Sequence, residues 1–110
     1  MNIRDILQEI CLNESESRVY LVLLECGEIS ASEIALKAHL HRTNAYDVLE
    51  SLIKKGMIHH VIKNDTRHFS AAPPQKIIEC LKEKEEHFRR LEKDAIGLIP
   101  ALLKNKSKQE

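Results

Sequence analysis

The fold is decided by residues 29–56, ISASEIALKAHLHRTNAYDVLESLIKKG. Ser30 and Glu33 have the spacing of a capping box, which predicts that a short helix begins there. Apolar residues then recur at helical spacing over residues 45–53, which predicts a second helix that buries one face and ends before Gly56. A short capped helix, a brief turn and a longer amphipathic helix form the outline of a helix-turn-helix, whose second helix typically enters the major groove of DNA.

Elements on both sides of this stretch complete a small domain. Apolar residues over positions 3–11 follow a helical pattern, and Asn13 opens a second capped helix that ends at Gly27. Further on, residues 57–62 are apolar and rich in β-branched side chains, turn residues follow, and residues 66–70 return as a second strand. A hairpin directly after a helix-turn-helix predicts the wing of a winged helix.

A long helix is predicted at the C-terminal end. The pair Pro73-Pro74 suits the first turn of a new helix. Over residues 77–102 apolar side chains recur in alternating steps of four and three, which is a heptad seam. Such a seam needs a partner, and the simplest partner is the same helix of a second copy. Gly97 and Pro100 predict either a kink or a separate last turn that folds onto the first helix.

The expected fold is therefore mainly α with a small β-hairpin: a winged helix-turn-helix with a long C-terminal dimerisation helix. We assign residues 1–72 to the winged helix-turn-helix domain, residues 73–104 to the dimerisation helix and residues 105–110 to a disordered tail. The polar and basic composition of the last residues is the reason for the tail.

The charges of the chain are distributed unevenly, although its formal net charge is zero. Residues 1–35 hold two basic and seven acidic side chains, residues 36–68 hold six and three, and residues 69–110 hold nine and seven. The basic excess coincides with the second helix of the pair and with the hairpin. This distribution favours a polyanion as the partner of that region.

Cysteine usage and hydropathy indicate an intracellular protein. The three cysteines lie far apart within apolar helical patterns, which is typical of reduced thiols rather than of a disulfide framework. The sequence has no signal-peptide pattern and no apolar run of membrane-spanning length. We therefore expect a cytoplasmic location and no membrane partner.

The outward face of the second helix supplies the candidate DNA contacts. Base-reading side chains come from the N-terminal part of a recognition helix, and arginine and asparagine suit bidentate contacts with guanine and adenine. Arg42, Thr43 and Asn44 are therefore predicted base readers, and neighbouring positions and the wing tip are predicted to hold phosphates. The predicted DNA-binding residues are Ser32, Lys37, His41, Arg42, Thr43, Asn44, Tyr46, Asp47, Lys54, Lys63 and Arg67.

Other site types are less well supported by the sequence. Asp47 and Glu50 place two carboxylates on the outward face, where they could simply solvate the helix, with Glu50 pairing with Lys54 one turn on. His59 and His60 are adjacent strand residues that point to opposite faces, so no metal or cofactor is expected. The sequence holds no glycine-rich phosphate loop or catalytic signature, so we expect no enzyme.

Roughly residues 10–95 resemble the N-terminal winged-helix domain of the TrmB family of transcriptional regulators, which is best represented in archaea. The resemblance rests on ESRVY at residues 16–20, ASEIA at 31–35, RTNAYDVLESLIKKG at 42–56 and APP at 72–74. It implies dimerisation through terminal helices, binding to a palindromic operator, and DNA contacts by Arg42, Thr43 and Tyr46. Many members add a C-terminal sugar-binding domain, and we expect this chain to lack it.

The sequence thus predicts a sequence-specific DNA-binding transcriptional regulator, a homodimeric repressor acting on a palindromic operator in double-stranded DNA. An alternative is a winged-helix protein-interaction module of a larger assembly, with the heptad helix as its docking surface. The zero net charge and the carboxylates of Asp47 and Glu50 favour that alternative.

Overall fold

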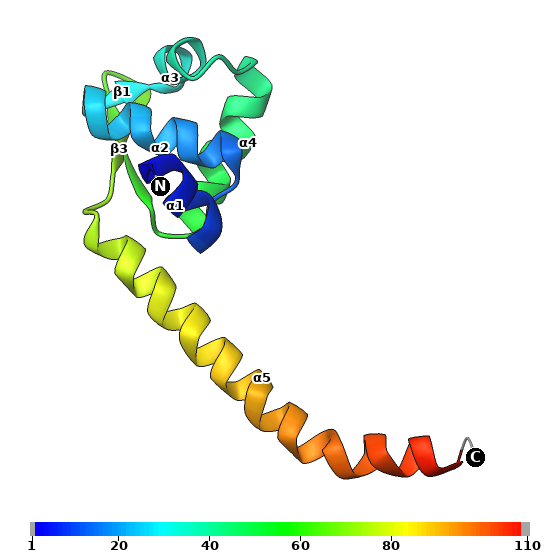
Figure 1. Ribbon diagram of the computed structural model, residues 1–110. Coiled ribbons are helices and arrows are strands. Elements are labelled where there is room, and N and C mark those ends of the chain that lie inside the picture. Colours follow the sequence, from blue (N-terminus) through cyan, green and yellow to red (C-terminus); the bar gives the residue numbers. More distant parts are fainter. Residues whose placement is uncertain (1, 109–110) are drawn as a thin grey trace.

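The computed structural model describes residues 2–108 and shows a small globular unit from which a long helix extends (Figure 1). The molecule measures 69 × 31 × 27 Å. It is mainly helical with a small sheet, as predicted. The elements in chain order are α1 (Ile3–Ile10), α2 (Glu14–Cys26), β1 (Ile29–Ser30), α3 (Ala31–Lys37), α4 (Arg42–Lys54), β2 (Ile58–Lys63), β3 (Thr66–Ala71) and α5 (Gln75–Lys108).

Side-chain caps fix where the first helices begin. Asn13 and Glu16 form a complete capping box at the start of α2, in which each side chain accepts a hydrogen bond from the other residue's backbone N–H (2.8 and 2.9 Å). At α3 the Ser30 hydroxyl accepts from the Glu33 N–H (3.4 Å). Gly56 follows α4 with φ of 74°, a left-handed conformation that glycine adopts without strain. The predicted helix starts and the end of α4 are confirmed.

The sheet has three antiparallel strands in the order β1-β3-β2. Lys63 pairs with Thr66, so the hairpin loop consists of Asn64 and Asp65, both with positive φ (51° and 61°). Two such residues make the type I′ turn that suits the twist of a β-hairpin. The predicted hairpin is confirmed. The sequence analysis missed β1, because two residues carry no detectable period.

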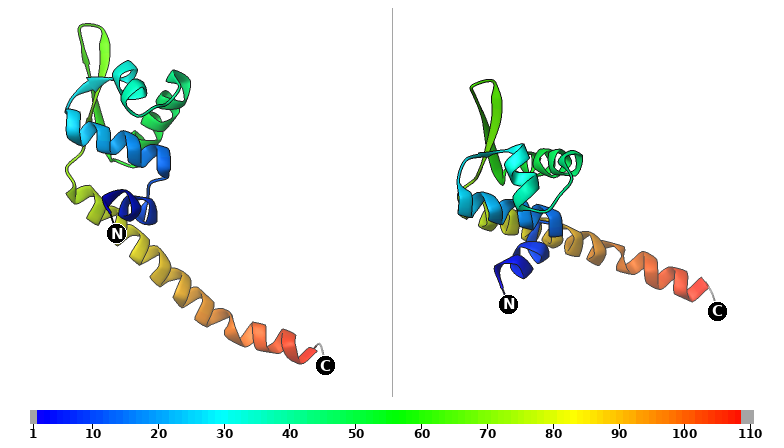
Figure 2. Two further views of the ribbon diagram at one scale, coloured as in Figure 1. Left: turned by 45° about the horizontal axis from the view of Figure 1, so that its top comes forward. Right: turned by 90° about the horizontal axis from the view of Figure 1, so that it is seen from above.

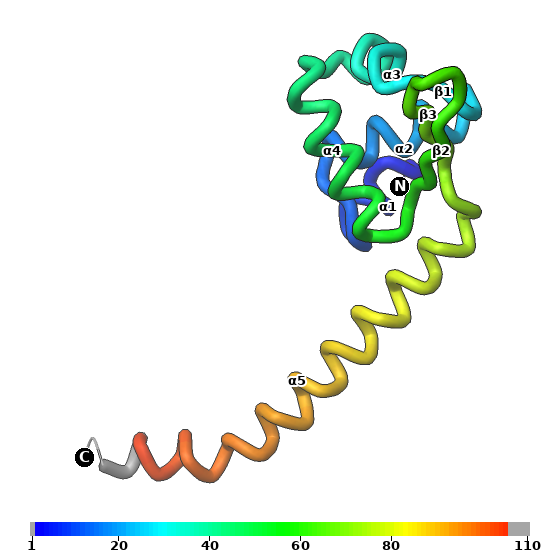
Figure 3. The backbone as a smooth tube through the Cα atoms, turned by 180° about the vertical axis from the view of Figure 1, so that it is seen from behind, coloured from blue at the N-terminus to red at the C-terminus, as the bar shows by residue number. Residues whose placement is uncertain are grey.

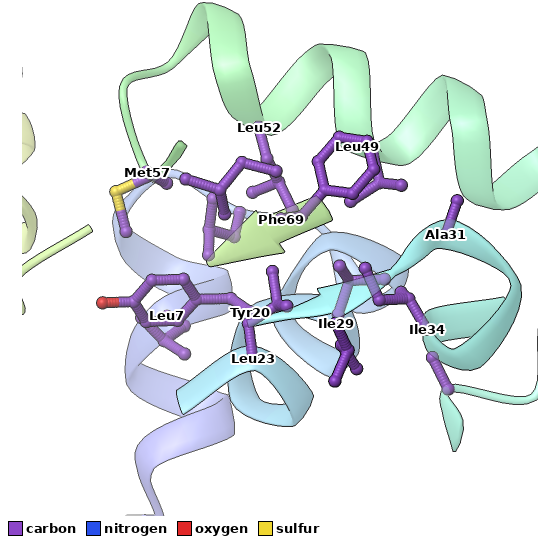
Figure 4. Close-up of a cluster of buried hydrophobic side chains, with 14 residues drawn as sticks. Leu7, Tyr20, Leu23, Ile29, Ala31, Ile34, Leu49, Leu52, Met57 and Phe69 are labelled. Carbon is purple, nitrogen blue, oxygen red and sulfur yellow. The ribbon is translucent and has the colours of Figure 1, made fainter. Parts of the chain in front are cut away.

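The core lies between α2, α3, α4 and β3 (Figure 4). Tyr20 and Phe69 are its largest side chains, and both are fully buried. Leu49 and Leu52 of α4 pack against them, as the helical spacing predicted. The hydroxyl of Tyr20 donates to the Ala72 carbonyl (3.4 Å), which joins α2 to the end of β3. This core holds α4 and the wing in one rigid relation.

The helix α5 leaves the core after its first turns. Ile77 and Cys80 are half-buried, whereas every side chain from residue 81 to residue 105 is exposed. Pro100 lies inside the helix, which changes direction in its orange part (Figures 1 and 3). The predicted kink is therefore the outcome, and the alternative of a last turn folded onto α1 is wrong. Residues 105–108 are helical where a disordered tail was expected, because α5 runs on to Lys108. Residues 109 and 110 of that tail lie outside the described residues.

Candidate nucleic-acid interface

The helix pair α3–α4 and the hairpin β2–β3 project from the side of the domain that faces away from α5 (Figure 2). The turn between the two helices is tight: His39 has φ of 57°, and the Leu40 N–H donates to the Ala35 carbonyl (2.9 Å). Leu40 is half-buried and packs against the core, which fixes the turn. The first turn of α4 is thus presented to solvent beside the wing.

The first turn of α4 carries the predicted base readers. Arg42, Thr43 and Asn44 are exposed, whereas Ala45 on the opposite side of the helix is fully buried. His41 is the N-cap residue, and its side chain makes no capping hydrogen bond, so the N–H groups of this turn stay available to a phosphate. All predicted DNA-binding residues are exposed except Arg67, which is half-buried.

Lys54 is separated from this group. It lies at the other end of α4, roughly 18 Å from Arg42 at the rise of an α-helix. There it lines a groove together with Cys11 and Cys80, on the side of the domain where α5 begins. The structure therefore does not bring Lys54 together with the predicted base readers.

Both cationic side chains of the predicted wing contact are engaged within the protein. Lys63 pairs with Glu28 (2.5 Å), and Arg67 pairs with Glu50 (2.7 Å). Glu50 was expected to pair with Lys54 along α4, but its partner is Arg67 on β3. A DNA phosphate that binds either cation must compete with a carboxylate.

Arg67 is the centre of a cluster that joins the wing to α4. Its Nη1 donates to Glu50 Oε1 and its Nε donates to His60 Nδ1, both at 2.7 Å. Its guanidinium lies 5.0 Å from the centroid of the Phe69 ring, which is a cation–π contact. Arg67 was expected at the wing tip, but it pairs with Ile62 and shares the inner face of β3 with Phe69. The side chain therefore turns toward α4.

A second polar cluster, which the sequence analysis missed, fixes α4 against α2. Glu16 is 1% exposed, and its carboxylate accepts from Ser51 Oγ (2.6 Å) and Lys55 Nζ (2.8 Å). Burial by itself would raise the pKa of this carboxyl, but the hydrogen bonds from Lys55, Ser51 and the Asn13 N–H lower the pKa below its usual value. Ser51 was expected on the outward face and is half-buried instead.

A third contact fixes the end of α3. Arg18 Nη1 donates to the Ala38 carbonyl (3.1 Å), which ties α2 to the last turn before the helix-turn-helix turn. Glu16, Arg18 and Lys55 all lie in the segments that carry the family resemblance. That resemblance was the signal that could have marked them, because spacing cannot pair residues that are about 20 or 40 positions apart.

Other site types find no geometry among residues 2–108. No group of three or more histidine, cysteine, aspartate or glutamate side chains in this part of the chain is placed to hold a metal ion. No described helix combines the length and apolar character needed to cross a membrane.

The family model "Sugar-specific transcriptional regulator TrmB" matches residues 7–75. The chain belongs to the TrmB family. It is 34% identical over 93 residues to the uncharacterised protein YrhO of Bacillus subtilis (strain 168), covering 84% of this chain and 34% of YrhO. It is 31% identical over 77 residues to the sugar-sensing regulator TrmBL1 of Pyrococcus furiosus, covering 70% of this chain and 22% of TrmBL1. The chain thus spans about a third or less of these relatives.

Solved structures share the fold. An archaeal chromatin protein, TrmBL2, superposes with a TM-score of 0.82 at 24% identity, over 98% of this chain and 41% of TrmBL2. The homodimeric winged helix-turn-helix DNA-binding domain of Mb0332 from Mycobacterium bovis gives 0.56 at 16% identity, over 80% and 81%. MepR of S. aureus, bound to an oligodeoxyribonucleotide, gives 0.60 at 12% identity, over 97% and 86%. At these identities the likeness establishes a winged helix-turn-helix fold.

Proposed function

We propose that this TrmB-family protein is a sequence-specific DNA-binding transcriptional regulator that acts as a homodimeric repressor on a palindromic operator in the cytoplasm. The observation that carries the proposal is the exposed, uncapped first turn of α4, which stands beside the wing on one side of the domain. Family membership and the DNA-bound winged-helix neighbour support the same function. Repression follows from steric blockage, because a bound dimer occupies the DNA that polymerase must enter.

The proposed contacts divide by chemistry. Arg42 and Asn44 read base edges, with Thr43 and Asp47 beside them, because the first turns of a recognition helix reach the floor of the groove. A cytosine amino group is the base-edge donor that the Asp47 carboxylate would accept. The proposed phosphate contacts are Ser32, Lys37, His41, Tyr46 and Lys63. Lys54 is excluded because of its distance, and Arg67 acts through the position of the wing.

The proposed dimer forms through α5. Phe88, Leu91, Leu98 and Leu102 belong to one heptad seam, and each is at least 47% exposed in the single chain. Burying such side chains stabilises a helix pair by roughly 1.5–3 kcal/mol each. A symmetric pair would present two α4 helices to successive turns of DNA, roughly 34 Å apart.

The test is binding of the purified protein to a fluorescent duplex from its own upstream region, against a scrambled duplex, at several salt concentrations. We expect preference for the native duplex and a linear fall of log K with log salt. Asn44→Ala should weaken only the native duplex, by about 1–3 kcal/mol. Lys63→Ala should weaken both duplexes equally and reduce the salt slope by about one unit.

Lys93→Ala is the matched control, because it removes the same charge from an exposed position of α5. It should leave both affinities unchanged. The exposed apolar seam also favours a second function, a protein-interaction module. Absence of duplex binding even at low salt would contradict the DNA function and leave the seam as the functional surface.

A further inference from the structure

Two cysteines that are far apart in the sequence meet where α5 joins the domain. Cys11 is the residue that ends α1, and Cys80 lies on the second turn of α5. Both thiols are free and half-buried, and their side chains are hydrogen-bonded to each other. Both also line one groove of about 520 Å³. The third cysteine, Cys26, is exposed at the end of α2.

The surroundings of this pair hold it in place. Lys55 Nζ donates to the Cys11 carbonyl and to Glu16 Oε1, both at 2.8 Å, which fixes the backbone of Cys11. Cys80 packs on the edge of the core, like Cys11. Neither thiol therefore needs a large movement of the chain to reach the other.

The groove has a defined charge. Three lysines and one carboxylate line it together with a histidine: Lys54, Lys55, Lys84, Glu83 and His87. The excess of positive charge attracts a small anion, and it stabilises a thiolate over a thiol. The groove is open to solvent on the side of the lysines, so a small reagent has access to the sulfur atoms.

We propose that Cys11 and Cys80 form a dithiol site that small anionic disulfides, of the chemical class of oxidised glutathione, convert into an intramolecular disulfide. The lysines of the groove bind the carboxylates of the reagent. The exposed Cys26 stands outside this site.

The reaction balances in two exchange steps. The Cys80 thiolate attacks one sulfur of the reagent, an S–S bond forms as the reagent's S–S bond breaks, and the first small thiolate leaves and takes up a proton. Cys11 then loses its proton to solvent and attacks the Cys80 sulfur, which expels the second small thiol. Two protein thiols and one small disulfide thus become one protein disulfide and two small thiols.

The order of the two steps follows from the environment of Cys11. Burial, the hydrogen bond with Cys80 and the charge of Cys80 raise the pKa of the Cys11 thiol to about 12. Cys11 is therefore protonated at neutral pH and reacts slowly with a reagent from solution. Its attack becomes effective only when the mixed disulfide on Cys80 lies beside it.

The disulfide would fix the direction of α5. Cys80 is the last half-buried side chain of this helix before the exposed run of residues 81–105. The bond would join that point to α1, closing a loop of 69 residues between positions 11 and 80. Closing a loop of this length removes conformational entropy from the unfolded chain and stabilises the fold.

The test treats the full chain with oxidised glutathione and follows free thiols, intact mass and peptide maps. The wild type and Cys26→Ser should each lose two thiols from the Cys11–Cys80 pair and about 2 Da of mass, because two hydrogens leave. Cys11→Ser should stop at a stable mixed disulfide on Cys80. Cys80→Ser should react at Cys11 at least tenfold more slowly than the wild type reacts at Cys80.

Two physical measurements complete the test and require no DNA, so their outcome is independent of the proposed function. The melting temperature of the oxidised wild type should rise by about 10 °C or more and return on reduction with dithiothreitol. Amide exchange in residues 76–84 should slow at least tenfold. Peptide maps that show only mixed disulfides, or bonds to Cys26, would overturn the proposal, and mapping the wild type makes this result independent of any variant's folding.

Discussion

At the scale of single residues, Glu16 links the start of α2 to the end of α4. Its side chain accepts from the Asn13 N–H, from Ser51 and from Lys55, and it is almost completely buried. A buried carboxylate is stable only when such donors replace water. The position of the recognition helix therefore depends on the ionised form of one side chain.

Glu16 should give the fold a dependence on pH below 4.5, the usual pKa of this carboxyl. The pKa is lower in the folded than in the unfolded chain, so its stabilisation is fully present above the unfolded value. It is lost as pH falls through the folded value. Glu16→Gln should cost roughly 1–3 kcal/mol of unfolding free energy at pH 7, because the charged hydrogen bond to Lys55 is lost. Urea titrations between pH 7 and pH 2 measure both effects.

The matched control is Glu9→Gln on the exposed face of α1. Its unfolding free energy should follow that of the wild type at every pH. The Glu16→Gln curve should instead approach the wild-type curve as the pH falls. A constant difference between these two curves down to pH 2 would show that the charge of Glu16 does not stabilise the fold.

At the scale of elements, the cluster around Arg67 couples β3 of the wing to α4. Glu50 neutralises the guanidinium, and His60 accepts a hydrogen bond through Nδ1, so this nitrogen carries no proton. The pair is partly exposed, so it contributes no more than about 1 kcal/mol to stability. Its larger effect is on the electrostatic potential between wing and helix, where one positive charge is cancelled.

Glu50→Gln should increase DNA affinity. Removing this carboxylate releases the charge of Arg67 toward the phosphates. We expect affinity for any duplex to rise about three- to tenfold, with a salt slope steeper by about one unit. Fluorescence anisotropy at several salt concentrations measures both quantities.

Glu86→Gln on α5 makes the same change of charge away from the wing and should leave affinity within about twofold. A fall in affinity for Glu50→Gln would contradict the prediction. It would mean that DNA binding requires the orientation that Glu50 gives to Arg67 rather than the free charge.

Local signals explain how much of these elements the sequence could predict. Capping residues and apolar periods located the helices, the hairpin and the end of α4 at Gly56, because each signal lies within the element itself. The direction of Arg67 and the contact between Glu16 and Lys55 depend on how strands and helices meet. Those contacts are set by packing between distant segments, which spacing along the chain does not encode.

The same limit applies to the candidate site. Periodicity placed Arg42, Thr43 and Asn44 on the exposed side of α4, where the structure has them. It could not show that Lys54 lies at the far end of the helix beside Cys80, or that Lys63 is paired with Glu28. Position along a helix therefore predicts exposure well and proximity poorly.

At the scale of the whole molecule, α5 is too exposed to be explained by its own domain. A helix of 34 residues touches the core only through its first turns, and its apolar seam faces solvent in the single chain. Isolated helices owe little of their stability to propensity alone and require a packed face. A second copy of α5 satisfies this need, because the seam repeats at the spacing of a coiled coil.

Leu91→Glu should therefore dissociate the protein into monomers, because it places a carboxylate in the seam of both copies. We expect the dimer dissociation constant, measured by sedimentation equilibrium, to rise at least about a hundredfold. Lys93→Glu is the control, since at about 100° per residue it lies nearly opposite Leu91 on α5. A monomeric wild type, or equal weakening by both variants, would contradict the seam. If the dimer spans two operator half-sites, Leu91→Glu must also weaken binding to the palindrome far more than binding to a single half-site, because only the palindrome gains from joining two domains.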